Sequence, residues 1–157
     1  MTKRKFCGIR HFESGQAATV QYLCEHGALL DLQDNSGNTA LHVAVSNGHL
    51  DFTQVLLEKG ANLCAADASG STALHIAAKS GYLNIVQYSA DSFASTDMQN
   101  AKKESALLVA AAEGHEKIVR FLIEQGAGIG VRDIEGKSAL EITTVNGSTA
   151  IIQVLKD

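Results

Sequence analysis

Apolar and polar positions follow one pattern that returns along the chain every 33 residues. The clearest copy is GNTALHVAVSNGH, from Gly37 to His49, in which a hydroxyl residue opens an apolar run that ends in glycine. Copies begin again at Gly70, Lys103 and Gly136. A fixed period of this length is typical of stacked helical units, none of which buries its apolar face without its neighbours.

The first half of each copy predicts a short helix. Thr39 precedes the apolar run, and its hydroxyl can accept a backbone N–H of the first turn. Leu41, Ala44 and Val45 then fall on one face at helical spacing. Gly48 stops the helix, because glycine readily takes the left-handed conformation of a helix exit. The slot of Thr39 is filled in the later copies by Thr72, Ser105 and Ser138.

The second half of each copy predicts another helix, from about Leu50 to Glu58 in the clearest copy. Its apolar side consists of Phe52, Val55 and Leu56, and Gly60 closes it as a C-cap. The segment that leads into a copy carries aspartate and glycine, which suit a tight turn. Each unit is therefore expected to be a helix, a turn, a second helix and a projecting hairpin-like loop.

These residues carry a resemblance to a known family. The pattern D-x-x-G-x-T-A-L-H-x-A, then G-H, then V-x-x-L-L-x-x-G-A, resembles the ankyrin repeat, fully from Asp34 to Ala61 and strongly again from Asp67. The resemblance implies an all-α repeat solenoid of stacked helix-turn-helix units with hairpin-like loops. It also implies that His42 and His75 are structural, each bonded to the threonine hydroxyl and to the neighbouring loop.

The 33-residue step divides the chain into one domain of about five units. We number them in chain order and expect the first to be a degenerate N-terminal cap and the fifth a truncated C-terminal cap with a polar outer face. The predicted units are residues 1–33, 34–66, 67–99, 100–132 and 133–157.

The third unit departs from the pattern. Ser89 replaces the first leucine of the pair that its siblings carry, Asn100 replaces the aspartate of the next loop, and Lys103 replaces the turn glycine. The loop is therefore expected to lack the turn chemistry of the others, and the join from Ser89 to Lys103 to be the weak point of the stack. Two interpretations are open: a degenerate unit patched by Phe93 or Met98, and a specialised contact surface or hinge.

Composition narrows the class of function. A net charge of −4 and a pI near 5.8 argue against attraction to nucleic acid. We find no apolar run long enough to insert into a membrane and no signal-peptide segment. Three cysteines without framework spacing agree with a reducing compartment, so a cytoplasmic or nuclear location is expected. We also expect the protein to be a monomer.

The segments that resemble catalytic or ligand-binding motifs lack the context or spacing that those motifs require. The GAGIG segment from Gly126 to Gly130 follows a predicted helix, whereas a dinucleotide fingerprint follows a strand. The spacings among Cys7, His11, Cys24 and His26 match no standard zinc site. We therefore predict no enzyme activity, no cofactor and no metal.

The remaining prediction is a scaffold that binds another protein on its concave face, by which we mean the side formed by the loops and first helices. The later units are expected to dominate the energy, because Ile134 and Val145 can bury apolar area. The alternative is a module of a larger enzyme, channel or signalling protein. Carried over from the resemblance, the partner-contacting residues are Asn35, Ser36, Asn38, Ser46 and Asn47; Ala68, Ser69, Ser71, Lys79 and Ser80; Ala101, Lys102, Glu104, Ala112 and Glu113; and Ile134, Glu135, Lys137, Val145 and Asn146.

Overall fold

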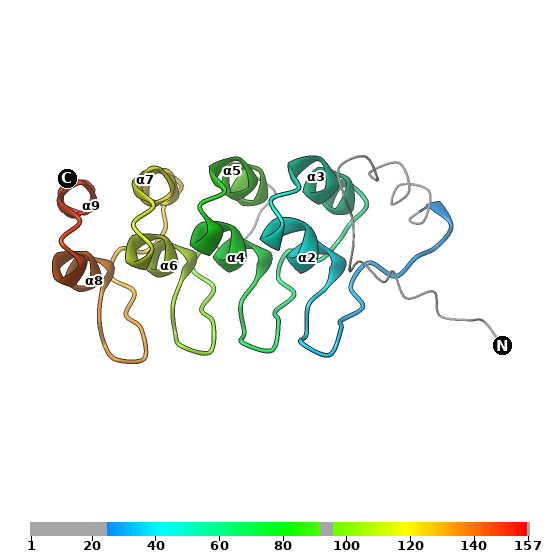
Figure 1. The fold of residues 1–157 in the computed structure, drawn as a ribbon, viewed down its shortest axis with the longest axis horizontal. Coiled ribbons are helices and arrows are strands. Elements are labelled where there is room, and N and C mark those ends of the chain that lie inside the picture. The colour runs from blue at the N-terminus through cyan, green and yellow to red at the C-terminus, as the bar shows by residue number, and fades with distance from the viewer. Residues whose placement is uncertain (1–24, 92–95, 157) are drawn as a thin grey trace.

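A computed structural model describes residues 25–91 and 96–156, and it places them in a row of helix pairs (Figure 1). The first helix of each pair lies in one layer, the second in another, and the hairpin-like loops project beyond the first layer. Within the described residues the only strand-like pairing is an isolated bridge between Arg132 and Ser138. The predicted all-α repeat solenoid is confirmed. The pairs are α2 (Ala40–Ser46) with α3 (Leu50–Glu58), α4 (Ala73–Ser80) with α5 (Leu83–Asp91), α6 (Ala106–Ala112) with α7 (Glu116–Glu124), and α8 (Ala139–Asn146) with α9 (Thr149–Val154).

Each first helix begins directly after its hydroxyl residue. Thr39, Thr72, Ser105 and Ser138 all take an extended conformation and are the N-caps, as predicted. The Ser105 hydroxyl accepts the N–H of Leu108 at 3.4 Å. This satisfies one of the donors that the first turn of a helix leaves without an intrahelical partner.

Glycine at the turn between paired helices has a second role besides its conformation. Gly48 and Gly81 both have positive φ, at 72° and 77°. A Cβ at Gly48 would come within 2.9 Å of the Tyr82 ring, and one at Gly81 within 2.8 Å of the His115 ring. The next unit therefore packs directly on the bare backbone. At the far end of α3 the C-cap is Lys59 and not Gly60 as predicted. Gly60 is the next residue and takes the positive φ, at 89°.

The core forms where equivalent slots of successive units meet. Leu41, Leu74 and Leu107 are each at most 3 % exposed, and the alanines one helical turn later are fully buried beside them. First helices pack against first helices and second helices against second helices along the whole row. A buried leucine contributes about 2 kcal/mol. Small alanines let the helices approach closely.

The hairpin-like loops are joined to one another by backbone hydrogen bonds. At each tip an N–H donates to a carbonyl of the preceding tip, so that the loops form a continuous ladder along one edge of the stack. The donors are Ala68, Ala101 and Ile134, and their acceptors are Ser36 (3.0 Å), Ser69 (3.0 Å) and Lys102 (2.8 Å), respectively.

The loop that leads into the fourth unit corrects the sequence prediction, because its turn is intact. The side-chain oxygen of Asn100 accepts the N–H groups of Lys102 and Glu104 at 2.9 and 3.0 Å, as the Asp67 carboxylate does for Ser69. Lys103 takes φ 58° and is the one non-glycine residue with positive φ in the described chain. An amide oxygen can accept the same N–H groups as a carboxylate, so the turn survives both substitutions at the cost of backbone strain.

The missing leucine of the third unit leaves a polar defect. Ser89 is completely buried, and its hydroxyl has no hydrogen-bond partner among the described residues. The equivalent residues Leu56 and Leu122 are also completely buried, but their side chains are apolar. Met98 is half-buried, whereas Phe93 lies outside the described residues.

The two terminal units are described to different extents. Most of the predicted N-terminal cap lies outside the described residues, so that prediction and the five-unit division stay predictions. In the fifth unit Leu140 is only half-buried, where Leu107 is buried. Thr144 is exposed, and its hydroxyl donates to the Leu140 carbonyl at 2.6 Å. A polar side chain thus lies where the inner units carry a buried apolar one, Val45, Ala78 or Ala111.

The Ser89 defect predicts a stabilising substitution. Ser89→Ala removes a buried, unpartnered hydroxyl and should raise the free energy of unfolding by about 1 kcal/mol. The matched control is Thr53→Ala on α3, because the buried Thr53 hydroxyl donates to the His49 carbonyl at 2.8 Å. That control should lower the stability. Urea denaturation of both variants measures the difference, and a destabilised Ser89→Ala variant would contradict the prediction.

The strained turn at Lys103 predicts a second stabilising substitution. Lys103→Gly should raise the free energy of unfolding by about 1 kcal/mol, because glycine takes a positive φ without the steric cost that lysine has there. Gly70→Ala at the equivalent position is the control, and it should destabilise because its Cβ would lie 2.8 Å from the Ala101 nitrogen. Thermal unfolding monitored by circular dichroism gives the sign of each change; equal effects of both variants would refute the argument.

Candidate partner-binding surface

The residues predicted to contact a partner are accessible. Seventeen of the twenty are exposed, and the other three, Asn38, Ser71 and Glu104, are half-buried. These three share one slot, directly after the turn residue of each hairpin, where the chain enters the first helix. The predicted contact residues therefore lie on the loops and at the ends of the first helices.

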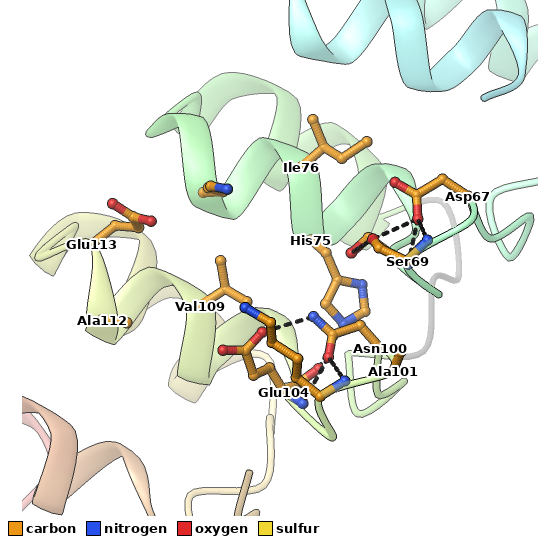
Figure 2. A pocket seen from close by; sticks show the side chains of 13 residues that line it. Asp67, Ser69, His75, Ile76, Asn100, Ala101, Glu104, Val109, Ala112 and Glu113 are labelled. Atoms are coloured by element: carbon orange, nitrogen blue, oxygen red, sulfur yellow. Dashed lines mark hydrogen bonds between the residues drawn. The ribbon is translucent and has the colours of Figure 1, made fainter. Parts of the chain in front are cut away.

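A groove of about 420 Å³ lies between the third and fourth units (Figure 2). In the close-up, Glu113 at the end of α6 marks one side, and Asp67 and Asn100 of the hairpins mark the other. Ile76 on α4 and Val109 on α6 lie between them. The groove brings together eight of the predicted residues, which are Ser69, Ser71, Lys79, Ala101, Lys102, Glu104, Ala112 and Glu113.

The hairpin side of the groove is held by two turns of the same design. The Asp67 carboxylate accepts the N–H groups of Ser69 and Ser71, at 2.8 and 2.9 Å, and the Ser69 hydroxyl at 2.7 Å. Burial raises the pKa of Asp67, but these hydrogen bonds outweigh it, so that its pKa lies below the ordinary value of 3.8. On the neighbouring hairpin the Asn100 amide donates to the Glu104 carboxylate at 2.8 Å.

The floor of the groove was not predicted. Ile76 and Val109 line it, although neither belongs to the predicted contact set. Both follow directly after the slot of His42, and Val43 and Ile142 stand at the same place in the second and fifth units. The sequence does contain a signal for these two residues. A β-branched aliphatic residue stands at this place in every described first helix and repeats every 33 residues. On sequence alone it looks like an ordinary core position.

The two histidines lock the loops to the helices. In the second unit the Thr39 N–H and hydroxyl both donate to Nδ1 of His42, at 3.1 and 2.8 Å. Nε2 of His42 lies 3.1 Å from the Ser71 carbonyl, which only accepts, so Nε2 carries the proton. Thr72 and His75 repeat the arrangement, with Nε2 of His75 at 3.0 Å from the Glu104 carbonyl. The predicted structural role of both histidines is confirmed.

The later units lack this link, because Leu108 and Glu141 occupy the histidine slot. Glu141 nevertheless forms the bonds to the N-cap residue that histidine forms in the second and third units. Its carboxylate accepts the Ser138 N–H and hydroxyl, both at 2.7 Å, and pairs with Arg132 at 2.8 Å. The hydrogen bonds from Ser138 lower the pKa of Glu141 below its ordinary value of 4.5. A contact from Glu141 to a further hairpin is absent from the described chain.

Some of the predicted residues outside the groove already have partners. The Ser46 hydroxyl and the Asn47 amide both donate to the Val43 carbonyl, at 3.0 and 2.8 Å. The Asn146 amide reaches the preceding unit and donates to the Ala112 carbonyl at 3.1 Å. Lys137 forms an ion pair with Glu135 at 2.6 Å. Ile134 and Val145 differ from these, because 64 % and 82 % of their surfaces are exposed.

Comparison with protein families gives a match over nearly the whole chain. A family model described as ankyrin repeats, in three copies, matches residues 9–88 and again residues 74–157. The chain belongs to the ankyrin-repeat family. Ankyrin repeats are generally protein-interaction modules and are typically non-catalytic. A comparison with curated proteins gives no significant match.

Two further properties of this ankyrin stack concern ligands and membranes. Across residues 25–91 and 96–156, no helix is both long and apolar enough to cross a membrane. In the same ranges no three His, Cys, Asp or Glu side chains gather in an arrangement that could hold a metal ion. Of the four residues considered for zinc, Cys7, His11 and Cys24 lie outside the described residues.

The His75 lock predicts a loss of stability in acid. Burial lowers the pKa of His75 below its ordinary value of 6.5, although the carbonyls of Glu104 and Met98 and the charges of Glu104 and Asp67 oppose the shift. The lowered pKa means that folding favours the neutral ring. Its contribution is complete above pH 6.5 and is lost as the pH falls through the folded-state pKa. Protonation at Nδ1 would also set a donor against the two donors of Thr72.

The measurement is an NMR titration of the His75 ring together with urea denaturation from about pH 8 to about pH 5. We expect a titration midpoint below 6.5 and a falling free energy of unfolding as the pH drops. His75→Leu places in this slot the residue that the fourth unit has at Leu108. The free energy of unfolding of this variant should depend less steeply on pH. A midpoint at or above 6.5 would show that folding does not favour the neutral ring.

Proposed function

We propose that this protein is a scaffold that binds a partner protein on the concave face of its ankyrin stack. The observation that carries the proposal is the groove between the third and fourth units, where eight of the predicted contact residues lie together. Polar hairpin atoms form one side, aliphatic side chains form the floor, and charged helix ends form the other side. An apolar centre with a polar rim is the usual composition of a protein–protein interface.

The fifth unit is proposed to contribute the largest single increments of binding energy. Ile134 at a hairpin tip and Val145 at the end of α8 are the most exposed large apolar side chains in the described chain. Their counterparts are Ala101 and Ala112 in the fourth unit, which line the groove. Covering exposed aliphatic surface releases roughly 25 cal/mol for each Å² removed from water. A partner that spans the fourth and fifth units would gain this energy.

The test is capture of a partner from a cell lysate by the immobilised chain, followed by measurement of the affinity of the captured protein. Ile134→Ala combined with Val145→Ala should weaken binding by more than about 1 kcal/mol, which is at least about fivefold in Kd. The helical circular dichroism signal should not change, because both side chains are exposed.

A matched control keeps the test specific. Leu29→Ala combined with Ile129→Ala also truncates two exposed aliphatic residues, with 54 % and 41 % exposure, but neither belongs to the predicted contact set. This control should bind like the unaltered chain. If the control weakens binding as much as the double variant of Ile134 and Val145, the partner does not use the concave face.

A further inference from the structure

An aliphatic row runs along the concave face. It consists of the residues that follow the histidine slot in the four described first helices, namely Val43, Ile76, Val109 and Ile142. Three of them are half-buried, and Val109 is 9 % exposed. Ile76 and Val109 form the floor of the groove. The row therefore offers one shallow apolar contact per unit.

The step of this row suits one kind of occupant. The first helices pack side by side from α2 through α8, and packed helices lie about 8–10 Å apart. In an α-helix, residues seven apart lie on the same side and about 10.5 Å apart. In an extended strand, residues on one side repeat at about 6.7 Å or twice that. A helix laid along the row matches its step, and a strand does not.

The helix-end wall of the groove adds a pattern of charge. Lys79 lies in the last turn of α4, and Glu113 is the C-cap of α6, one unit further along the same wall. Both are exposed, and neither forms an ion pair within residues 25–91 and 96–156. On the hairpin wall, by contrast, the Glu104 carboxylate already accepts the Asn100 amide. Two charges of opposite sign, one unit apart, are thus open to a partner.

We propose that the occupant of this groove is an amphipathic α-helix of the partner protein. Its aliphatic side chains at positions i, i+3 or i+4, and i+7 would lie over Ile76 and Val109. One flank would carry an acidic residue against Lys79 and a basic residue against Glu113, about two helical turns apart. The inference rests on the proposed function, and it adds the conformation and the charge pattern of the bound segment.

The probes are four synthetic helical peptides of about 18 residues, each with leucine at i, i+3, i+4 and i+7. They differ only at two flank positions seven residues apart, which carry Glu and Lys, Lys and Glu, two Glu, or two Lys. Fluorescence anisotropy at low salt measures their affinity for the full chain. One of the two mixed peptides should bind about fivefold more tightly than either like-charged peptide.

Charge reversal on the protein should change the preferred peptide. In Lys79→Glu the groove wall carries two acids, so the two-Lys peptide should become the tightest binder. In Glu113→Lys it carries two bases, so the two-Glu peptide should become the tightest. Lys117→Glu on the exposed surface of α7 is the matched control and should leave the order unchanged. A proline in the middle of the best peptide should abolish its binding, because it breaks the helix.

Each result bears on the inference. A preference that switches with both reversals supports it. An order that does not follow the reversals overturns it, and so does equal binding of the proline peptide, which would point to an extended occupant. If no peptide binds while the Ile134 and Val145 variant still loses the captured partner, the helix inference fails and the proposed function stands. If that variant also keeps the partner, both fail.

Discussion

The stacking of equivalent apolar slots from one unit to the next is the interaction on which the rest of the structure depends. A pair of short helices has too little interior to fold alone. Leu41, Leu74 and Leu107 are buried in first helices that pack against the first helices of neighbouring units. Leu140, at the end of the described row, is only half-buried. Each unit must therefore present matching surfaces on both sides, which explains why one period dominates the sequence.

Departures from the period are tolerated where a backbone or polar contact can be kept by another chemical group. Asn100 holds its turn with an amide oxygen, and Glu141 caps its helix in place of histidine. Ser89 differs, because no group in the described part of the chain satisfies its buried hydroxyl. The hairpin at the end of the irregular join is thus intact, whereas the second helix before it carries a buried hydroxyl without a partner among the described residues. Both interpretations of the join stay open.

Sequence reasoning found the framework because caps, glycines and apolar runs act locally. The bounds of α3 and the four N-caps follow from residues at fixed offsets, whereas the bonds of His42 and His75 are implied by the resemblance to the ankyrin repeat. It missed Lys103, since a lysine carries no signal for positive φ and only the surrounding turn imposes it. It also missed Ile76 and Val109 as groove floor, because partial burial depends on how far neighbouring helices cover a side chain.

The ladder of hairpin tips has a consequence for how such a surface can change. The bonds that join Ala68 to Ser36 and Ala101 to Ser69 run between main-chain atoms, so the side chains at these tips take no part in them. The frame that spaces the tips therefore does not depend on the side chains at these donor and acceptor positions, provided that the donor is not proline and that glycine stays at the neighbouring turn positions Gly37 and Gly70. The side chains of one tip can therefore change without displacing the next tip. The residues that a binding partner would meet can be replaced one loop at a time while the backbone stays the same.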